Sequence, residues 1–216
     1  MSEEHFIGIY IVKKKLFNLR TIKNILSCLG RFPKTDESIQ YILNNLSEPS
    51  DVILPETKVN DIQLTINFSG NLDHYNYRIS DNYSAFEITV PEGNVCDVDG
   101  QHERLYRIIL KIFNEVGATF FIGTNTDIIY NDTSSSFQRL LGGIYIFRRS
   151  DDLKLPILSN PNFINLDDDL EIIRFNNEFY WPMPESDVDP MIHYVTLFFQ
   201  NEKINLQDGA PVGEFS

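Results

Sequence analysis

The sequence predicts a single domain of the α+β class, with a mostly antiparallel sheet, two or three helices packed on one face, and a strand-rich C-terminal third. Two observations favour this class. Apolar residues recur at helical spacing in a few segments, and they alternate or run continuously over short lengths in many others. The strand candidates also follow one another across short turns, which is typical of antiparallel pairing.

The strongest helix signal lies at residues 99–117. Asp97 and Asp99 are suited to cap its first N–H groups, Glu103 adds negative charge to its first turn, and Gly117 is a natural end. An apolar run at 118–122 then predicts a buried strand. The helix is amphipathic, and its apolar stripe consists of Leu105, Ile108, Ile109, Ile112, Phe113 and Val116.

Before this helix the pattern predicts both strands and helices. The predicted strands cover residues 5–12, 61–68, 75–79 and 85–90, and the last three are expected to form an antiparallel meander. The predicted helices cover residues 18–29 and 37–46. Residues 44–57 contain Pro49 and Pro55 and are expected to form a connection with a short β piece at 52–54.

After the central helix and its strand, a long polar loop is expected at 123–136, followed by a helical turn at 137–141. Further strands are predicted at 144–149, at 170–181 with a turn at Asn176 and Asn177, and at 192–199. We expect residues 1–206 to form one domain and residues 207–216 to form a flexible tail.

The chain is strongly acidic, and its net negative charge is unevenly distributed along the sequence. The chain of 216 residues has 31 acidic and 18 basic side chains, a net charge of −13. Residues 1–150 contribute −3 of this, whereas residues 151–216 hold 13 acidic and 3 basic side chains and contribute −10. Such a surface repels nucleic-acid phosphates and attracts basic proteins, so we expect a basic protein partner and no nucleic acid.

The sequence indicates a cytoplasmic protein without a membrane partner. It shows neither a secretory signal pattern nor an apolar run of the roughly 20 residues that a membrane-spanning helix needs. Its two cysteines, Cys28 and Cys96, match neither a disulfide framework nor a zinc pattern. The sequence offers no indication of oligomeric state.

Signals for enzymatic chemistry are weak, and we expect no metal or other cofactor. Asp97, Asp99, His102 and Glu103 are close in sequence, but they lack the spacing of a calcium loop, and helix capping explains the carboxylates. No nucleophile motif, phosphate-binding loop or dinucleotide fingerprint occurs.

The candidate functional residues lie in the C-terminal third, where carboxylates and aromatic residues alternate. Part of the aromatic set must belong to the core, and the rest suits an interface with a basic protein. The predicted partner-binding residues are Asp167, Asp168, Asp169, Glu171, Glu178, Tyr180, Trp181, Glu185, Asp187 and Asp189.

The function predicted from these features is that of a small acidic binding protein that inhibits or sequesters a basic partner. An immunity protein that neutralises a bacterial toxin is an example of this class. One alternative is a metal-dependent hydrolase in which carboxylates such as Asp97 and Asp99, or Asp167 and Asp169, converge on a cation. A second alternative is a structural subunit of a larger assembly.

Overall fold

The structure is a computed structural model, and it describes residues 5–13, 53–59, 62–67, 71–72, 77–79, 82–91, 100–125, 142–149, 152–159, 161, 163–166, 169–175 and 183–208. Within these ranges the chain has an α+β fold, as the sequence predicts. None of the helices found there is long and apolar enough to cross a membrane. The helices predicted at 18–29 and 37–46, and the helical turn predicted at 137–141, lie outside the described residues.

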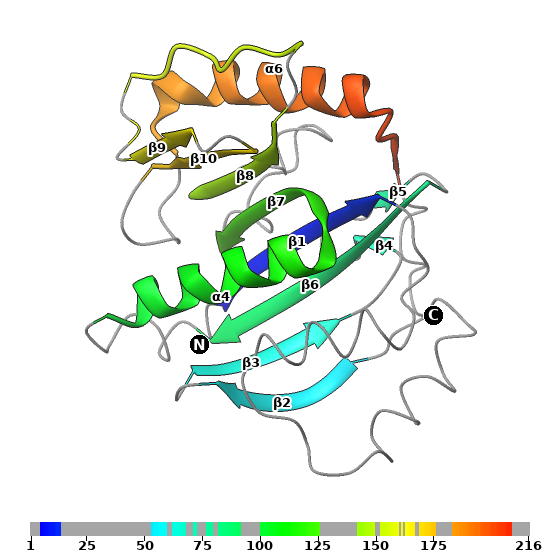
Figure 1. Ribbon diagram of the computed structural model, residues 1–216, viewed down its shortest axis with the longest axis vertical. Helices are drawn as coiled ribbons and strands as arrows, with labels where there is room; N and C mark the ends of the chain where they lie inside the picture. The colour runs from blue at the N-terminus through cyan, green and yellow to red at the C-terminus, as the bar shows by residue number, and fades with distance from the viewer. Residues whose placement is uncertain are drawn as a thin grey trace, which may run out of the picture.

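Most of the described strands belong to one large antiparallel sheet (Figure 1). Its order is β2 (Ile53–Val59), β3 (Ile62–Asn67), β6 (Tyr83–Pro91), β1 (His5–Lys13), β7 (Ala118–Asn125), β8 (Ile144–Arg148), β10 (Leu170–Arg174) and β9 (Phe163–Leu166). A small second sheet has the order β11 (Leu206–Asp208), β5 (Tyr77–Ile79) and β4 (Asn71–Leu72). The strands predicted at 5–12, 61–68, 75–79, 85–90, 118–122 and 144–149 are therefore confirmed. The meander predicted for 61–68, 75–79 and 85–90 is wrong, because β3 pairs directly with β6, whereas β5 pairs with β4 and β11 in the second sheet.

The central strands of the large sheet are buried on both faces. On β1, Tyr10 points to one face, while Ile7, Ile9 and Ile11 point to the other, and all four are fully buried. Residues directly opposite each other in antiparallel strands share a face. The Tyr10 ring therefore stacks on Phe86 of β6, with 4.5 Å between ring centroids, and contacts Phe121 of β7 at 4.6 Å. A sheet of this kind needs apolar cover on each side.

Helix α4 (Gln101–Val116) covers the Tyr10 face of the sheet. The Tyr10 hydroxyl donates a hydrogen bond to the Ile109 carbonyl at 3.3 Å. From β8, the Arg148 guanidinium lies over the Phe113 ring at 5.5 Å, and its Nε donates to the Ala118 carbonyl at 3.0 Å. Leu105, Ile109 and Ile112, which the helical stripe places inward, are fully buried, so this prediction is confirmed.

The two ends of α4 differ in how well the sequence predicted them. The helix ends at Gly117, as expected, with φ of 63° and a hydrogen bond from its N–H to the Asn114 carbonyl at 3.2 Å. At the start, the N-cap residue is Gly100 with φ of 80°, and no side chain caps the helix. The predicted capping residues, Asp97 and Asp99, lie outside the described residues.

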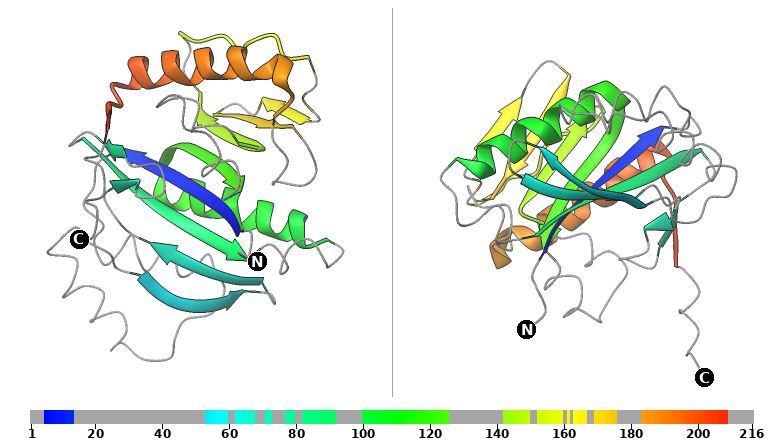
Figure 2. Two further views of the ribbon diagram at one scale, coloured as in Figure 1. Left: turned by 180° about the vertical axis from the view of Figure 1, so that it is seen from behind. Right: turned by 90° about the horizontal axis from the view of Figure 1, so that it is seen from below.

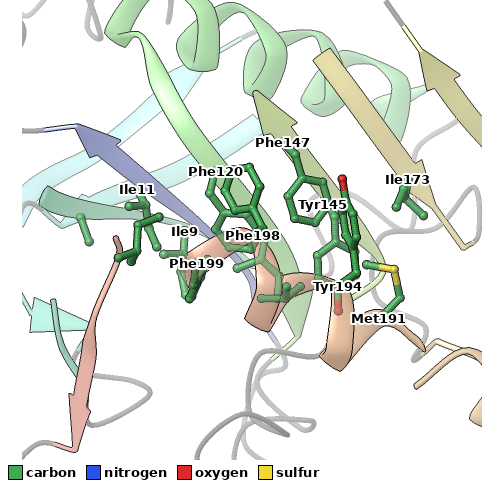
Figure 3. Close-up of a cluster of buried hydrophobic side chains, with 14 of the residues drawn as sticks. Ile9, Ile11, Phe120, Tyr145, Phe147, Ile173, Met191, Tyr194, Phe198 and Phe199 are labelled. Atoms are coloured by element: carbon green, nitrogen blue, oxygen red, sulfur yellow. The ribbon is translucent and has the colours of Figure 1, made fainter. Parts of the chain in front are cut away.

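Helix α6 (Glu185–Glu202) covers the opposite face of the sheet (Figure 2). Its aromatic side chains pack among those of β7 and β8 (Figure 3). The Phe147 ring lies 5.0 Å from Tyr194 and 5.1 Å from Phe198, and Phe199 meets Phe120 edge-on at 5.0 Å. Phe175, Tyr194, Phe198 and Phe199 of the C-terminal third belong to this core.

The prediction of a strand at 192–199 is wrong, because these residues form the second half of α6. Branched and aromatic residues favour a strand locally, but the buried residues also match a helical stripe. That stripe consists of Met191, Tyr194, Val195, Phe198 and Phe199. Tertiary packing selects the helix, because the α6-facing side of the sheet is apolar and a long amphipathic helix covers it.

The arrangement of the helices also differs from the expectation of a single helical face. The two described helices lie on opposite faces, since the continuous apolar strands leave neither face suited to water. The C-terminal third accordingly combines the short strands β9, β10 and β11 with an 18-residue helix.

Three smaller differences concern strand limits. Pro55 lies within the edge strand β2, at an irregularity between Leu54 and Thr57, where a missing N–H is tolerated. The hairpin partner of β10 is β9, and the turn predicted at 176–177 lies outside the described residues. β11 pairs with β5, so regular structure extends to Asp208, and residues 209–216 of the predicted tail are outside the described ranges.

Candidate functional site

Helix α6 positions three of the predicted partner-binding residues. Its inward stripe is fixed by the aromatic core, which sets the direction of every other side chain on the helix. Glu185 and Asp189 are exposed, and the same exposed side continues through His193 and Leu197. Because Glu185 and Asp189 are four residues apart, their carboxylates are neighbours on the helix surface.

Asp187, the third of these residues, is buried and serves the fold. Its Oδ1 accepts a hydrogen bond from the Ser159 N–H at 2.7 Å, and its side chain is fully shielded from solvent. Ser159 ends the 152–159 segment, which runs alongside α6 (Figure 1) and packs Leu153, Leu155 and Leu158 against the core. Asp187 therefore holds this segment against the helix and is unavailable to a partner.

Glu171 of β10 is also buried and lies under α6. The Tyr194 hydroxyl donates a hydrogen bond to Glu171 Oε2. Burial is the main cause that raises the pKa of the Tyr194 hydroxyl far above its ordinary value, and the hydrogen bond and negative charge of Glu171 add to it. The phenol thus remains a donor, and the pair joins α6 to the sheet.

Asp169 precedes β10 and is exposed. Its backbone carbonyl accepts a hydrogen bond from the Arg149 N–H at 3.0 Å, which leaves its carboxylate facing solvent. Asp169, Glu185 and Asp189 form no ion pair with another described residue. We call these three exposed carboxylates the acidic surface.

The other half of the predicted set cannot be placed. Asp167, Asp168, Glu178, Tyr180 and Trp181 lie outside the described residues. The structure thus leaves three predicted residues on the surface and assigns Glu171 and Asp187 to internal hydrogen bonds.

Candidate metal ligands do not converge in the described part of the chain. Within it, no group of three or more His, Cys, Asp or Glu side chains is arranged to hold a metal ion. Glu103 instead lies near two arginines, with its carboxylate 3.6 Å from Arg107 Nε and 3.9 Å from Arg174 Nη1. Arg174 also lies over the Tyr106 ring at 4.6 Å, so this cluster connects α4 to β10.

A polar pocket that the sequence did not predict lies at the C-terminal end of α6. It has a volume of about 490 Å³ and forms where β1 ends, β6 begins and α6 ends. Lys13, the last residue of β1, is part of its lining. The remaining residues come from distant parts of the chain, and the full lining is Lys13, Asn82, Tyr83, Asn201, Glu202 and Lys203.

Comparison with known proteins adds no assignment. The chain matches no model of a known protein family, and a search of curated proteins finds no match to it.

Proposed function

We propose that this protein is an acidic binding protein that docks a basic protein through the acidic surface and thereby inhibits or sequesters it. The observation that carries the proposal is that some carboxylates around α6 are buried and others are exposed. Glu171 and Asp187 are buried and hydrogen-bonded within the fold, whereas Asp169, Glu185 and Asp189 face solvent without an ion pair to a described residue.

The charge around the acidic surface supports a cationic partner. The last third of the chain carries a net charge of −10, which produces a field that accelerates the approach of a basic protein. Glu185 lies in the first turn of α6, where an exposed carboxylate faces the positive end of the helix dipole. The presence of its charge therefore costs the free protein little stability.

Apolar side chains next to the acidic surface supply contact area. Leu197 lies on the exposed side of α6 with 36% of its surface accessible, and Ile157 of the neighbouring 152–159 segment is 96% exposed. Protein interfaces commonly place apolar anchors inside a polar rim. In this arrangement, the carboxylates steer the partner and the two aliphatic side chains are buried against it.

An immunity protein that neutralises a bacterial toxin is the most specific form of this proposal. A toxin that cleaves nucleic acid needs a cationic cleft to bind phosphates. Rigidly held carboxylates on α6 would occupy such a cleft by matching the charge of the phosphates. The binding protein then blocks substrate access and needs no chemistry of its own.

The test is to identify the basic partner in the native host and to measure its affinity and its residual activity with two matched double variants. Glu185→Gln with Asp189→Asn removes two charges from the acidic surface. Glu103→Gln with Glu115→Gln removes two charges from exposed residues of α4, on the opposite face. We expect the first variant to raise Kd by about tenfold or more at low salt, mainly through slower association.

The control variant should keep the affinity and the inhibition of the wild-type protein. Equal losses in both variants would indicate a nonspecific charge effect and would contradict the proposal. An acidic partner, or a Kd independent of both substitutions and of salt, would overturn it.

A further inference from the structure

The pocket at the end of α6 brings two lysines together in a region that is otherwise acidic. Residues 151–216 contain only Lys154, Arg174 and Lys203 as basic residues. Arg174 is buried against Tyr106, and Lys154 is exposed on the 152–159 segment. Lys203 lines the pocket together with Lys13 from the end of β1.

Lys203 has a backbone conformation that is costly for a residue with a side chain. Lys203 has φ of 60° and ψ of 35°, almost the geometry of Gly117 at the end of α4, which has φ of 63° and ψ of 43°. Glycine adopts this left-handed conformation freely, whereas other residues are strained in it. Strained residues of this kind concentrate at functional sites, and here the strained residue is one of those that line a pocket.

Other contacts hold the pocket wall in place. The Tyr83 hydroxyl donates to the Glu202 carbonyl at 2.5 Å, and Lys13 Nζ donates to Glu202 Oε2 at 3.4 Å. Burial and the neighbouring Glu202 raise the pKa of the Tyr83 hydroxyl, so it remains a donor. Glu202 is therefore matched by Lys13, and Lys203 makes no ion pair with a described residue.

We infer that this pocket binds a small anion that carries a phosphate or a carboxylate group. Lys203 supplies the principal charge, Lys13 adds a second ammonium, and the amide group of Asn82 is suited to hydrogen-bond the polar remainder of the ligand. The volume of about 490 Å³ lies in the range of small-molecule sites. This inference does not depend on the proposed function, because the pocket lies at the opposite end of α6 from Glu185 and Asp189.

The test measures the melting temperature during titration with inorganic phosphate and, separately, with succinate, each against sodium chloride at equal ionic strength. A ligand that binds only the folded state raises the melting temperature in a saturable manner. We expect saturation with at least one of the two anions, and the preferred anion identifies the headgroup. Lys203→Gln should raise the Kd of the preferred anion by about tenfold or more.

Two further variants make the result decisive. Lys154→Gln removes the same charge from an exposed residue outside the pocket and should leave the titration unchanged. Lys203→Gly relieves the strained backbone, so it should keep or raise the melting temperature in the absence of anion while it weakens anion binding as Lys203→Gln does.

The inference is overturned if neither anion produces a saturable shift beyond that of sodium chloride. It is also overturned if Lys154→Gln and Lys203→Gln weaken the response equally, because the anions would then act by general salt effects. Undiminished anion binding by Lys203→Gly would likewise contradict it. None of these results affects the partner measurement on the acidic surface.

Discussion

Phe198→Ala and Phe199→Ala are each expected to lower the free energy of unfolding by about 3–5 kcal/mol, the cost of removing a large side chain from a packed core. Both rings are buried against the sheet, since α6 is a helix and consecutive residues on its inward side both reach the core. Leu197→Ala should cost less than about 1 kcal/mol, because that side chain is partly exposed. Chemical denaturation of the three variants measures these differences.

These variants distinguish a helix from the strand that local propensity favours at 192–199. In a half-buried strand, successive side chains point alternately to the core and to solvent, so only one of the two phenylalanines would be buried. A large cost for one phenylalanine, with a small cost for the other, would contradict the structure of α6.

Tyr194→Phe is expected to lower the free energy of unfolding by about 2–4 kcal/mol, although it removes a single oxygen atom. The loss leaves the buried Glu171 carboxylate without the hydroxyl that donates to it, and an unsatisfied buried charge is costly. The double variant Tyr194→Phe with Glu171→Leu should recover most of this loss, because replacing both partners removes the buried charge as well. A double variant no more stable than Tyr194→Phe would contradict this account of the pair.

The same pair determines part of the pH dependence of stability. The pKa of the Tyr194 hydroxyl is raised in the folded protein, so folding favours the protonated phenol. The contribution of the Tyr194 hydroxyl to folding stability is complete below its pKa in the unfolded chain, about 10, and is lost as the pH rises above that value. Wild-type protein should therefore lose stability faster above about pH 10 than Tyr194→Phe does. Equal slopes in denaturation curves measured across this pH range would argue against it.

Sequence pattern predicted the α4 half of the molecule well, because local and tertiary preferences agree there. The stripe that contains Leu105, Ile109 and Ile112 has only one plausible period, and Gly117 ends it with a residue suited to the left-handed conformation. The strand at 118–122 then has an apolar composition that favours burial on both faces. Each of these signals lies within a few residues of the element it predicts.

The α6 half was predicted poorly because two patterns compete there. Ile192, Tyr194, Val195, Phe198 and Phe199 have strand propensity, yet the buried members of the segment also fit a helical spacing. Composition cannot decide between these patterns. The decision comes from the apolar face of β1, β7 and β8, which is assembled from residues far away in the sequence.

The candidate site shows the same limit. The sequence identifies an acidic region, but it does not tell which of its carboxylates are buried. Glu171 and Asp187 accept hydrogen bonds within the fold. Asp169, Glu185 and Asp189 are exposed. Burial depends on tertiary structure. The pocket at Lys203 was missed for a related reason, since its lining joins residues 13, 82–83 and 201–203.

Amide chemical-shift mapping of the labelled protein during titration with its basic partner tests directly the proposal that the exposed carboxylates around α6 bind this partner. We expect the largest shifts near Asp169, Glu185 and Asp189, extending to Leu197, with small shifts along α4. Shifts centred on α4, with those around α6 unchanged, would contradict it.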